Sequence, residues 1–403
     1  MAQVEFTGRP QTWAAGELMQ LIRQRPDVSR SDLARQTGLS PTTITTRIES
    51  LLAHGYVAQD GDSTKGGRKP RALTVNPHWG FAVAVHLGAR HTRVGIVDMV
   101  GKLLLVREHE TSASNDMEGY LDWLTSEIQS LLAEIAETPG AGRLRGIGLS
   151  IPAPVDVASG ELIDPFHFPA WNRVSFIPRI ERTFGVPVVL NNDVTLMALG
   201  EHVLHRADVR NMIYVKIGSA LGCGIIIDDE VYRGNTGIAG EIAHLPVDTP
   251  FTRRCRCGRD NCLEACLGGA ALIEHMRNRG HQLATTAEFI ELAQSGDPDA
   301  VELAKAAGTA LGETLGLLSE FLNPAEIVLG GRLSQLGILT LALQSGLYAR
   351  SQPLSARDLS ITQSLARENA SILGAAWTII DLLFSEEHIN AEIAASEAKV
   401  SSS

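Results

Sequence analysis

The sequence has no long apolar run and few residues of the kinds that mark membrane or secreted proteins. No stretch approaches the roughly 18 uncharged apolar residues of a membrane span, and the N-terminus lacks the basic and then apolar layout of a signal peptide. Cysteine is scarce: there are five in 403 residues, and four of them fall within twelve residues. In an intracellular chain this clustering favours metal ligation over disulfides. We therefore expect a cytoplasmic protein with no membrane partner.

A strong positive charge is also missing. The net charge of −11 argues against a protein that coats nucleic acid indiscriminately. Residues 1–75 nevertheless carry 10 Lys and Arg against 7 Asp and Glu, which leaves −14 for the rest of the chain. A basic head on an acidic body is compatible with site-specific DNA binding, because only the docking face must match phosphate.

Three helices are predicted in the first 75 residues. They are expected over residues 13–25, 29–34 and 40–54, and the serines Ser29 and Ser40 fit the N-cap position of the second and third helices. A short glycine-containing turn separates these two helices, as in a helix-turn-helix, whose second helix enters the major groove.

A basic hairpin is predicted to follow the third helix. Strands expected over residues 56–59 and 72–75 flank the segment GDSTKGGRKPR, whose glycines and basic residues are typical of a wing. Ile44, Ile48 and Leu51 share one helical face and should be buried. The residues predicted to contact DNA have hydroxyl or basic side chains: Thr42, Thr43, Thr46, Arg47, Arg68, Lys69 and Arg71. The alternative is a helical dimerisation domain with a flexible basic linker. We favour a winged helix-turn-helix over residues 1–76.

The remainder is predicted to form two α/β lobes with a cleft between them. Strand-like runs such as FAVAVHLG and TRVGIVDM precede a helix expected over residues 117–137, and a similar plan recurs before a helix expected over about 301–321. Strand hairpins followed by crossover helices, appearing twice, indicate two lobes at least as large as ordinary domains.

Bounds can be assigned to the two lobes and to the end of the chain. We expect the first lobe over residues 77–195, completed by a C-terminal helix at about 370–390, and the second lobe over residues 196–369. Residues 391–403 are small and polar, and they are expected to form a flexible tail.

The strongest chemical signal is a histidine followed by clustered cysteines. His244 precedes Cys255, Cys257 and Cys262, which together provide one imidazole and three thiolates. This set suits a closed tetrahedral Cys₃His site, which is structural because no position is left for water. We predict one structural Zn²⁺ per chain; the alternative is a group of free, reduced thiols. Cys266 is expected to pack rather than ligate.

With these features in view, the sequence resembles the ROK family of repressors, open reading frames and kinases. The resemblance runs from about Phe81 to Leu383, and its most specific part is His244 followed by CRCGRDNCLE, which matches the family's His plus CxCGxxxCLE zinc signature. The repressor branch of this family also carries an N-terminal winged helix. The resemblance implies an actin-like, two-lobed sugar-kinase fold with a sugar bound in the cleft.

The resemblance also implies a sugar-binding set. In relatives the sugar hydroxyls are held by an Asn-Asp pair, by the Glu and His of an ExxH segment, and by the Glu directly after the zinc loop. The matching positions are Asn192, Asp193, Glu241, His244 and Glu264. Carboxylates and amides form paired hydrogen bonds with vicinal hydroxyls, and a zinc-bound imidazole can present its second nitrogen. His167 stands where many relatives have Asn, which leaves the identity of the sugar open.

Two phosphate-contacting segments of the kinases are degraded in this chain. The kinase pattern DxGGT reads HLGAR over residues 86–90, and GTGxGGG reads GSALGCG over residues 218–224. Side chains at former glycines obstruct the approach of a phosphate to the main chain. We therefore expect no kinase activity, although Asp193 would be the general base if the protein were a kinase.

These observations predict a sugar-responsive transcriptional regulator, and most simply a repressor of carbohydrate uptake or catabolism genes. We expect its partners to be operator DNA, a sugar or sugar phosphate, and further copies of itself in a homodimer or tetramer. One alternative is an active ATP-dependent sugar kinase with a fused DNA-binding domain. Another is a repressor controlled by a protein partner such as a sugar transporter.

Overall fold

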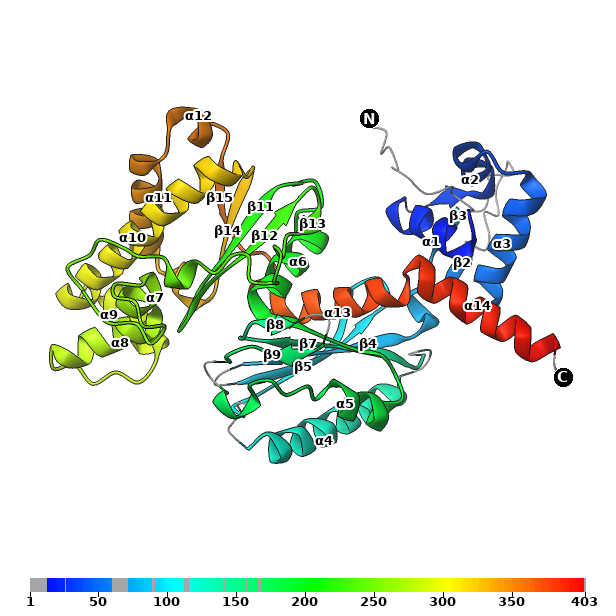
Figure 1. Ribbon diagram of the computed structural model, residues 1–403, viewed down its shortest axis with the longest axis horizontal. Coiled ribbons are helices and arrows are strands. Elements are labelled where there is room, and N and C mark those ends of the chain that lie inside the picture. Colours follow the sequence, from blue (N-terminus) through cyan, green and yellow to red (C-terminus); the bar gives the residue numbers. More distant parts are fainter. Residues whose placement is uncertain are drawn as a thin grey trace.

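The structure is a computed structural model with a small N-terminal head and a larger body built on two sheets (Figure 1). It describes residues 13–25, 27–59, 72–88, 91–111, 116–138, 140, 142–156, 159–165 and 168–401, with backbone alone at 399–401. Within these ranges no helix is both long and apolar enough to cross a membrane.

The head contains the three predicted helices. They are α1 (Ala15–Gln24), α2 (Arg30–Thr37) and α3 (Pro41–Ala53). Ser29 caps α2 by accepting a hydrogen bond from the Asp32 amide at 3.2 Å, and Ser40 caps α3 in the same way. The second helix extends three residues beyond the predicted end, to Thr37, because Gly38 with φ of 73° provides its C-cap. The predicted core face of α3 is confirmed, since Ile44, Ile48 and Leu51 are fully buried.

A three-stranded sheet completes the described part of the head. Its order is β1 (Val28–Ser29), β3 (Ala72–Val75) and β2 (Val57–Gln59), with both pairs antiparallel. The strand predicted over residues 72–75 is confirmed. The predicted wing contacts Arg68, Lys69 and Arg71 lie outside the described residues.

The first sheet of the body has five strands in the order β10-β7-β4-β5-β6. Its strands are β4 (Phe81–Leu87), β5 (Thr92–Asp98), β6 (Leu103–His109), β7 (Leu144–Ile151) and β10 (Val188–Asn192), with a small β8 (Val155–Asp156) and β9 (Glu161–Leu162) ribbon nearby. Figure 1 shows α4 (Met117–Ala136) and α5 (Ile177–Phe184) on one face and α13 (Ala370–Leu383) on the other.

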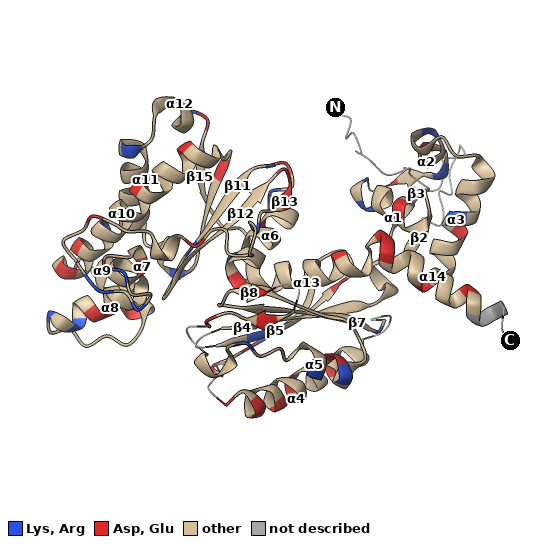
Figure 2. Ribbon diagram, viewed as in Figure 1, with Lys and Arg blue, Asp and Glu red and all other residues tan. Residues whose placement is uncertain are grey.

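Successive side chains of β4 point to opposite faces of the sheet, and both faces are covered by helices. Val83 and Val85 pack in the same core as α4 and α5, whereas Ala82 and Ala84 pack with α13. The small residues allow a close approach: a Cβ on Gly148 would collide with the backbone of Ala375. Figure 2 shows α13 nearly free of charge, as its buried position requires.

The second sheet also has five strands, in the order β13-β12-β11-β14-β15. They are β11 (Met212–Ile217), β12 (Leu221–Ile227), β13 (Glu230–Val231), β14 (Glu326–Gly330) and β15 (Ser360–Gln363). Much of this lobe is helical: α7 (Leu263–Leu267), α8 (Gly269–Asn278), α9 (Thr286–Ser295), α10 (Pro298–Leu322), α11 (Gly337–Arg350) and α12 (Pro353–Ala356).

Helix α6 (Asp193–His205) joins the two sheets. It packs on the second sheet through Val194 and Ala198, and it also packs on α13, which covers the first sheet. Glycines allow the helix pair to meet closely, because a Cβ on Gly200 would collide with the carbonyl of Ala370. Helices α6 and α13 therefore pack directly on each other.

The prediction of a flexible tail at the C-terminus is wrong as far as residue 401. Helix α14 (Glu386–Ser401) packs against α1, with Ile389 fully buried and Ile393 nearly so. Asn390 accepts a hydrogen bond from the Gly16 amide at 2.9 Å. The segment's small, polar composition suggested fraying, but two isoleucines one turn apart are enough to dock a helix on a preformed head.

Candidate functional site

Four of the predicted DNA-contacting residues of the head lie on α3, which Figure 1 shows on the side of the head away from the two sheets. Thr42 and Thr46 are exposed, and Arg47 is half-buried. The Thr46 hydroxyl donates to the Thr42 carbonyl at 3.2 Å, and the Thr43 hydroxyl lies 2.8 Å from that of Ser40. Thr43 therefore contributes to the helix cap as well as to the exposed surface.

The predicted metal ligands come together at one point of the second lobe. His244 belongs to a short turn, Cys255 and Cys257 lie on the following loop, and Cys262 immediately precedes α7. The ligand atoms of all four lie within 4.8 Å of one another. Gly258, with φ of 89°, supplies the left-handed turn that closes the loop.

The distances suit tetrahedral zinc. Cys255 Sγ lies 3.4 Å from His244 Nδ1, and Cys257 Sγ lies 3.6 Å from Cys262 Sγ. Zinc–sulfur bonds of about 2.3 Å and zinc–nitrogen bonds of about 2.0 Å separate tetrahedral ligands by about 3.5–3.8 Å. His244 turns Nδ1 toward the thiols, which leaves Nε2 for another partner.

The buried thiol of Cys262 has a raised pKa. Burial and the adjacent Cys257 and Cys255 raise the pKa of Cys262 to about 12. A thiol with such a pKa remains protonated at neutral pH unless a metal displaces its proton. Cys266 is fully buried beside this loop and Cys223 is buried in β12, so both pack as apolar residues.

Three predicted sugar-binding carboxylates and the histidine act on one another electrostatically. Desolvation raises the pKa of Glu241; His244 opposes this shift, and Glu264 and Asp193 add to it. The Glu264 carboxylate accepts a hydrogen bond from the Leu221 amide at 2.9 Å. We call His244, Glu241 and Glu264 the hydroxyl end of the site, because their acceptors and ring nitrogen match sugar hydroxyls.

The side chain of Asn192, the fifth predicted sugar contact, already uses most of its hydrogen-bonding groups within the chain. Its Oδ1 accepts hydrogen bonds from the Val194 and Thr195 amides, and its Nδ2 donates to the Ala153 carbonyl at 3.1 Å. Asn192 thus caps α6 and fixes the position of Asp193, with one side-chain N–H left for a ligand.

Lys216 is a partner of Asp193 that the sequence analysis missed. It lies on β11, and its Nζ donates to Asp193 Oδ2 at 2.5 Å. Burial alone would raise the pKa of Asp193, but the Lys216 ammonium and His86 lower it below its ordinary value. The only signal was a lysine in the otherwise apolar run NMIYVKIG. An anionic Asp193 paired with lysine is a weaker base than a free carboxylate.

His86 on β4 is buried beside Ser150 of β7 and Ser371 of α13. Its Nδ1 lies 3.0 Å from the Ser371 hydroxyl and 3.3 Å from that of Ser150. Desolvation lowers the pKa of His86 to about 3, so the ring is neutral at physiological pH. A neutral imidazole cannot replace a carboxylate as a magnesium ligand, because that ion prefers oxygen.

Two glycines of the second lobe, in β12 and directly after β14, have packing roles. A Cβ on Gly224 would meet Ala198 at 2.6 Å, so this glycine lets α6 lie on β12. Gly331 has φ of 82°, and a Cβ there would collide with the Ile217 carbonyl. Their presence is therefore explained without a bound nucleotide.

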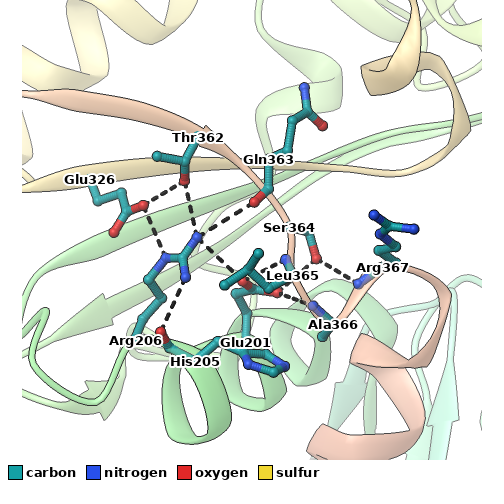
Figure 3. A network of polar contacts seen from close by, with 10 residues as sticks. All are labelled: Glu201, His205, Arg206, Glu326, Thr362, Gln363, Ser364, Leu365, Ala366 and Arg367. Atoms are coloured by element: carbon teal, nitrogen blue, oxygen red, sulfur yellow. Dashed lines mark hydrogen bonds and ion pairs between the residues drawn. The ribbon is translucent and has the colours of Figure 1, made fainter.

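A buried polar network ties α6 to the segment that leads into α13 (Figure 3). Glu201 is fully buried and accepts hydrogen bonds from the Ser364 hydroxyl at 2.7 Å and the Ala366 amide at 3.0 Å. Arg206 lies 3.8 Å from the Glu201 carboxylate and donates to Glu326 at 3.0 Å. Because each charge is paired, the network fixes the α6 helix relative to the second sheet.

Three aromatic residues join the head to the body. The ring of Trp79 lies 4.7 Å from that of Tyr56 in the head and 5.4 Å from that of Phe384, at the junction of α13 and α14. The Trp79 indole also donates to the His54 carbonyl at 3.0 Å. We call Tyr56, Trp79 and Phe384 the aromatic joint. Through these three rings the head packs directly against the end of α13.

Comparisons with known proteins agree with this architecture. The model of the ROK family matches residues 82–381, and that of the winged helix-turn-helix DNA-binding family matches residues 16–58. The chain is 26% identical over 367 residues to the xylose repressor of Bacillus spizizenii, covering 90% of this chain and 94% of that protein. It is 26% identical over 371 residues to the DNA-binding transcriptional dual regulator NagC of Escherichia coli K12, covering 88% and 89%.

A solved structure is similar over nearly the whole length. It is a ROK family transcriptional regulator described as a homologue of the E. coli Mlc protein. The TM-score is 0.81 at 25% identity, with 94% of this chain and 98% of that one covered. The fold is therefore shared over nearly the whole chain with a transcriptional regulator.

Proposed function

Because this chain belongs to the ROK family and carries a winged helix-turn-helix head, we propose that it is a sugar-responsive transcriptional repressor. Its body binds a sugar or sugar phosphate, and that binding changes the affinity of the head for operator DNA. The observation that carries the proposal is the continuous packing from the sugar-binding set through α6 and α13 to the aromatic joint. A kinase that only happened to be fused to DNA-binding residues would not need this connection.

On the DNA side, we assign the DNA-binding head to residues 1–76. Exposed Thr42 and Thr46 and half-buried Arg47 of α3 are proposed to read the major groove, with Thr43 at the start of the helix. Arg68, Lys69 and Arg71 are proposed to contact phosphates or the minor groove. One short helix reads only a few base pairs, so a homodimer or tetramer that presents two heads is required for specificity.

On the effector side, the hydroxyl end and Asp193 are proposed to hold the sugar. Four of the five predicted contacts act on one another electrostatically, and the fifth, Asn192, orients Asp193. Zinc bound by His244, Cys255, Cys257 and Cys262 would fix the ring of His244 with Nε2 directed away from the thiols. The role proposed for the metal is structural.

We also propose that the body does not transfer phosphate. Lys216 neutralises Asp193, and His86 stands where the kinases have a carboxylate. Phosphoryl transfer depends on positioning and on neutralising charge with a metal, and both requirements are weakened here. Asp193 keeps its position for sugar binding rather than for catalysis.

The proposed switch is a change in the placement of the heads. A sugar that contacts residues of α6 and of the second sheet shifts α6 against α13, and α13 continues into α14 and the aromatic joint. In a dimer, a small rotation of each head would spoil the match to half-sites one helical turn apart.

A thermal-shift screen of monosaccharides and their phosphates, with and without MgATP, tests the proposal. A ligand at 100 times its Kd should stabilise the body by about 2.7 kcal/mol. Glu264→Gln should abolish that shift, whereas the exposed control Glu313→Gln on α10 should keep it. Sugar-dependent release of ADP at turnover rates would overturn the proposal that the body does not transfer phosphate.

A further inference from the structure

We propose that Arg367 is the pivot of the movement between the two lobes, and that its left-handed backbone conformation sets the balance between the sugar-binding and DNA-binding forms of the protein. The inference rests on the proposed sugar-sensing function and specifies how the two sites are coupled. The chain crosses between the two sheets twice: at Asn192, where β10 meets α6, and over residues 364–369, which connect β15 to α13. We call residues 364–369 the return crossing.

The first observation is that the start of the return crossing is fixed to the second lobe. Glu201 on α6 is fully buried, and its carboxylate accepts hydrogen bonds from the Ser364 hydroxyl at 2.7 Å and the Ala366 amide at 3.0 Å (Figure 3). Arg206, one of the neighbours of Glu201, pairs with Glu326 of β14 at 3.0 Å. The chain up to Ala366 is therefore held on α6 and on the second sheet.

The second observation is that the end of the return crossing is fixed to the first lobe. The guanidinium of Arg93, a buried residue of β5, donates to the Glu368 carbonyl at 2.6 Å. In the first turn of α13, the Ser371 hydroxyl lies 3.0 Å from Nδ1 of His86 on β4. Helix α13 itself packs on β4 and β7. The chain from Glu368 onward is therefore held on the first sheet.

The third observation is the backbone conformation of Arg367, the residue between these two anchors. Its φ is 50°, in a region where residues other than glycine are uncommon and strained. Of the nine non-glycine residues with positive φ in the described ranges, the other eight lie within the head or within a single lobe. The side chain of Arg367 is exposed. Strain that is held by the surrounding contacts is typical of switch segments.

The packing of α6 on α13 allows a small movement of this kind. Gly200 of α6 faces the Ala370 carbonyl and Gly374 of α13 faces the Leu196 carbonyl, with no room for a Cβ at either glycine. Backbone and small residues present no long side chains that interlock, so the two helices can shear. The Asn192 side chain holds the start of α6 on a backbone carbonyl of the first lobe at 3.1 Å. The displacement is therefore largest at the return crossing.

The backbone change that accompanies this movement falls on Arg367. When the lobes rotate, Ala366 moves with α6 while Glu368 stays with β5, so the φ and ψ of the residue between them change. One form of the protein keeps Arg367 left-handed and the other releases it. A left-handed conformation disfavours an ordinary L-residue by a factor of about 5 to 30 in population, so substitutions that alter this preference shift the balance between the forms.

Four variants of the full-length, zinc-loaded protein test the pivot. Arg367→Gly removes the cost of a positive φ, whereas Arg367→Val increases it because valine is β-branched. Arg367→Ala removes the side chain and keeps an ordinary backbone preference. Arg173→Gly is the matched control, since Arg173 is also an exposed arginine with positive φ, 59°, but lies within the first lobe.

Two affinities are measured for each variant. Fluorescence anisotropy gives the Kd for an operator duplex selected from a randomised pool, and calorimetry gives the Kd for xylose, glucose, N-acetylglucosamine and the 6-phosphates of the last two. We expect Arg367→Gly and Arg367→Val to shift the operator Kd in opposite directions, with about fivefold or more between them, and to shift the sugar Kd in the reverse sense. Arg367→Ala and Arg173→Gly should remain within about twofold of wild type for both ligands.

Each outcome decides the question. Operator and sugar affinities that stay within about twofold of wild type in both Arg367→Gly and Arg367→Val would overturn the pivot, because Arg367 would then be strained but static. Affinities that fall together in one variant would also overturn it, since that is the effect of partial unfolding. If Arg367→Val does not fold, Arg367→Asn takes its place, and it should shift the operator Kd in the same direction as Arg367→Gly but less.

Failure of the pivot is distinguishable from failure of the proposed function. If none of the sugars or phosphates binds the wild type, the proposed function fails for these ligands. The operator Kd then decides the pivot alone: opposite shifts in Arg367→Gly and Arg367→Val support it, and an unchanged Kd rejects it. If a sugar binds and releases the wild type from the operator while both variants behave as the wild type does, the function stands and the pivot is rejected.

Discussion

Replacing Phe384 by alanine should loosen the packing of the head on the body and thereby destabilise the head, whose core is continuous with this residue. Phe384 is fully buried, its ring lies 5.4 Å from Trp79 and 6.2 Å from Tyr56, and its carbonyl accepts a hydrogen bond from the Gln20 amide side chain at 2.5 Å. Truncation of a buried phenylalanine costs about 3–5 kcal/mol, and loss of the aromatic pairs accounts for part of it. Since the ring lies where the two parts meet, most of this cost should fall on their docking.

Native-state hydrogen exchange measures this directly. Amides of α3 should lose protection by about two orders of magnitude or more, because 3 kcal/mol corresponds to more than a hundredfold change in an opening equilibrium. Amides of β4 should change little. Phe321→Ala is the matched control: Phe321 is 85% exposed on α10, and its truncation should alter stability by about 0.5 kcal/mol or less.

The functional consequence separates docking from folding. A loosely attached head should bind operator DNA more weakly and respond less to the sugar, while calorimetric affinity for the sugar stays within about twofold of wild type. Unchanged protection of α1 and α3 in Phe384→Ala would refute the argument, because it would show that the aromatic joint does not hold the head.

Three further predictions follow from other parts of the molecule. Cys262→Ser should lower bound zinc from about one equivalent per chain to less than about half, and should lower the midpoint of thermal unfolding, both measured on protein that has not been exposed to chelator. The pKa of buried His86, about 3, lies below its ordinary value of about 6.5. Between about pH 3 and pH 6.5, His86 therefore carries a proton in the unfolded chain but not in the folded one. Stability should be complete above about pH 6.5 and fall by about 1.4 kcal/mol per unit as the pH decreases. Urea unfolding at pH 7.5 and 5.5 should show this loss in the wild type and a smaller one in His86→Asn. Arg47→Ala should weaken operator binding by about 1–3 kcal/mol in an anisotropy titration, whereas exposed Arg210→Ala on the body should not.

Local signals in the sequence predicted the head well. Serine caps, the glycine after α2 and the apolar face of α3 are short-range features, and each is confirmed in the structure. The metal ligands could also be predicted from the sequence, because three cysteines and a histidine at that spacing have few other uses. Their ligand atoms do lie together.

Long-range contacts were the part that the sequence could not supply. The docking of α14 depends on α1, whose Gly16 is 374 residues away from Asn390 in the chain, so the composition of α14 alone suggested a loose tail. The pairing of Lys216 with Asp193 joins a strand to the start of a helix, and no periodicity reports it. The role of Asn192 as a helix cap likewise became visible only once the backbone of α6 was in place.

The most direct test of the central account is the operator affinity of the full-length protein with and without its ligand. A duplex selected by the protein from a randomised pool is titrated by fluorescence anisotropy at fixed salt, in the presence and absence of the sugar or sugar phosphate that gives the largest thermal shift. The account predicts that a saturating ligand changes the Kd for this duplex by about tenfold or more, and that Glu264→Gln, which binds the duplex normally, loses that response. A ligand that binds the body tightly yet leaves the Kd for DNA within about twofold would contradict it.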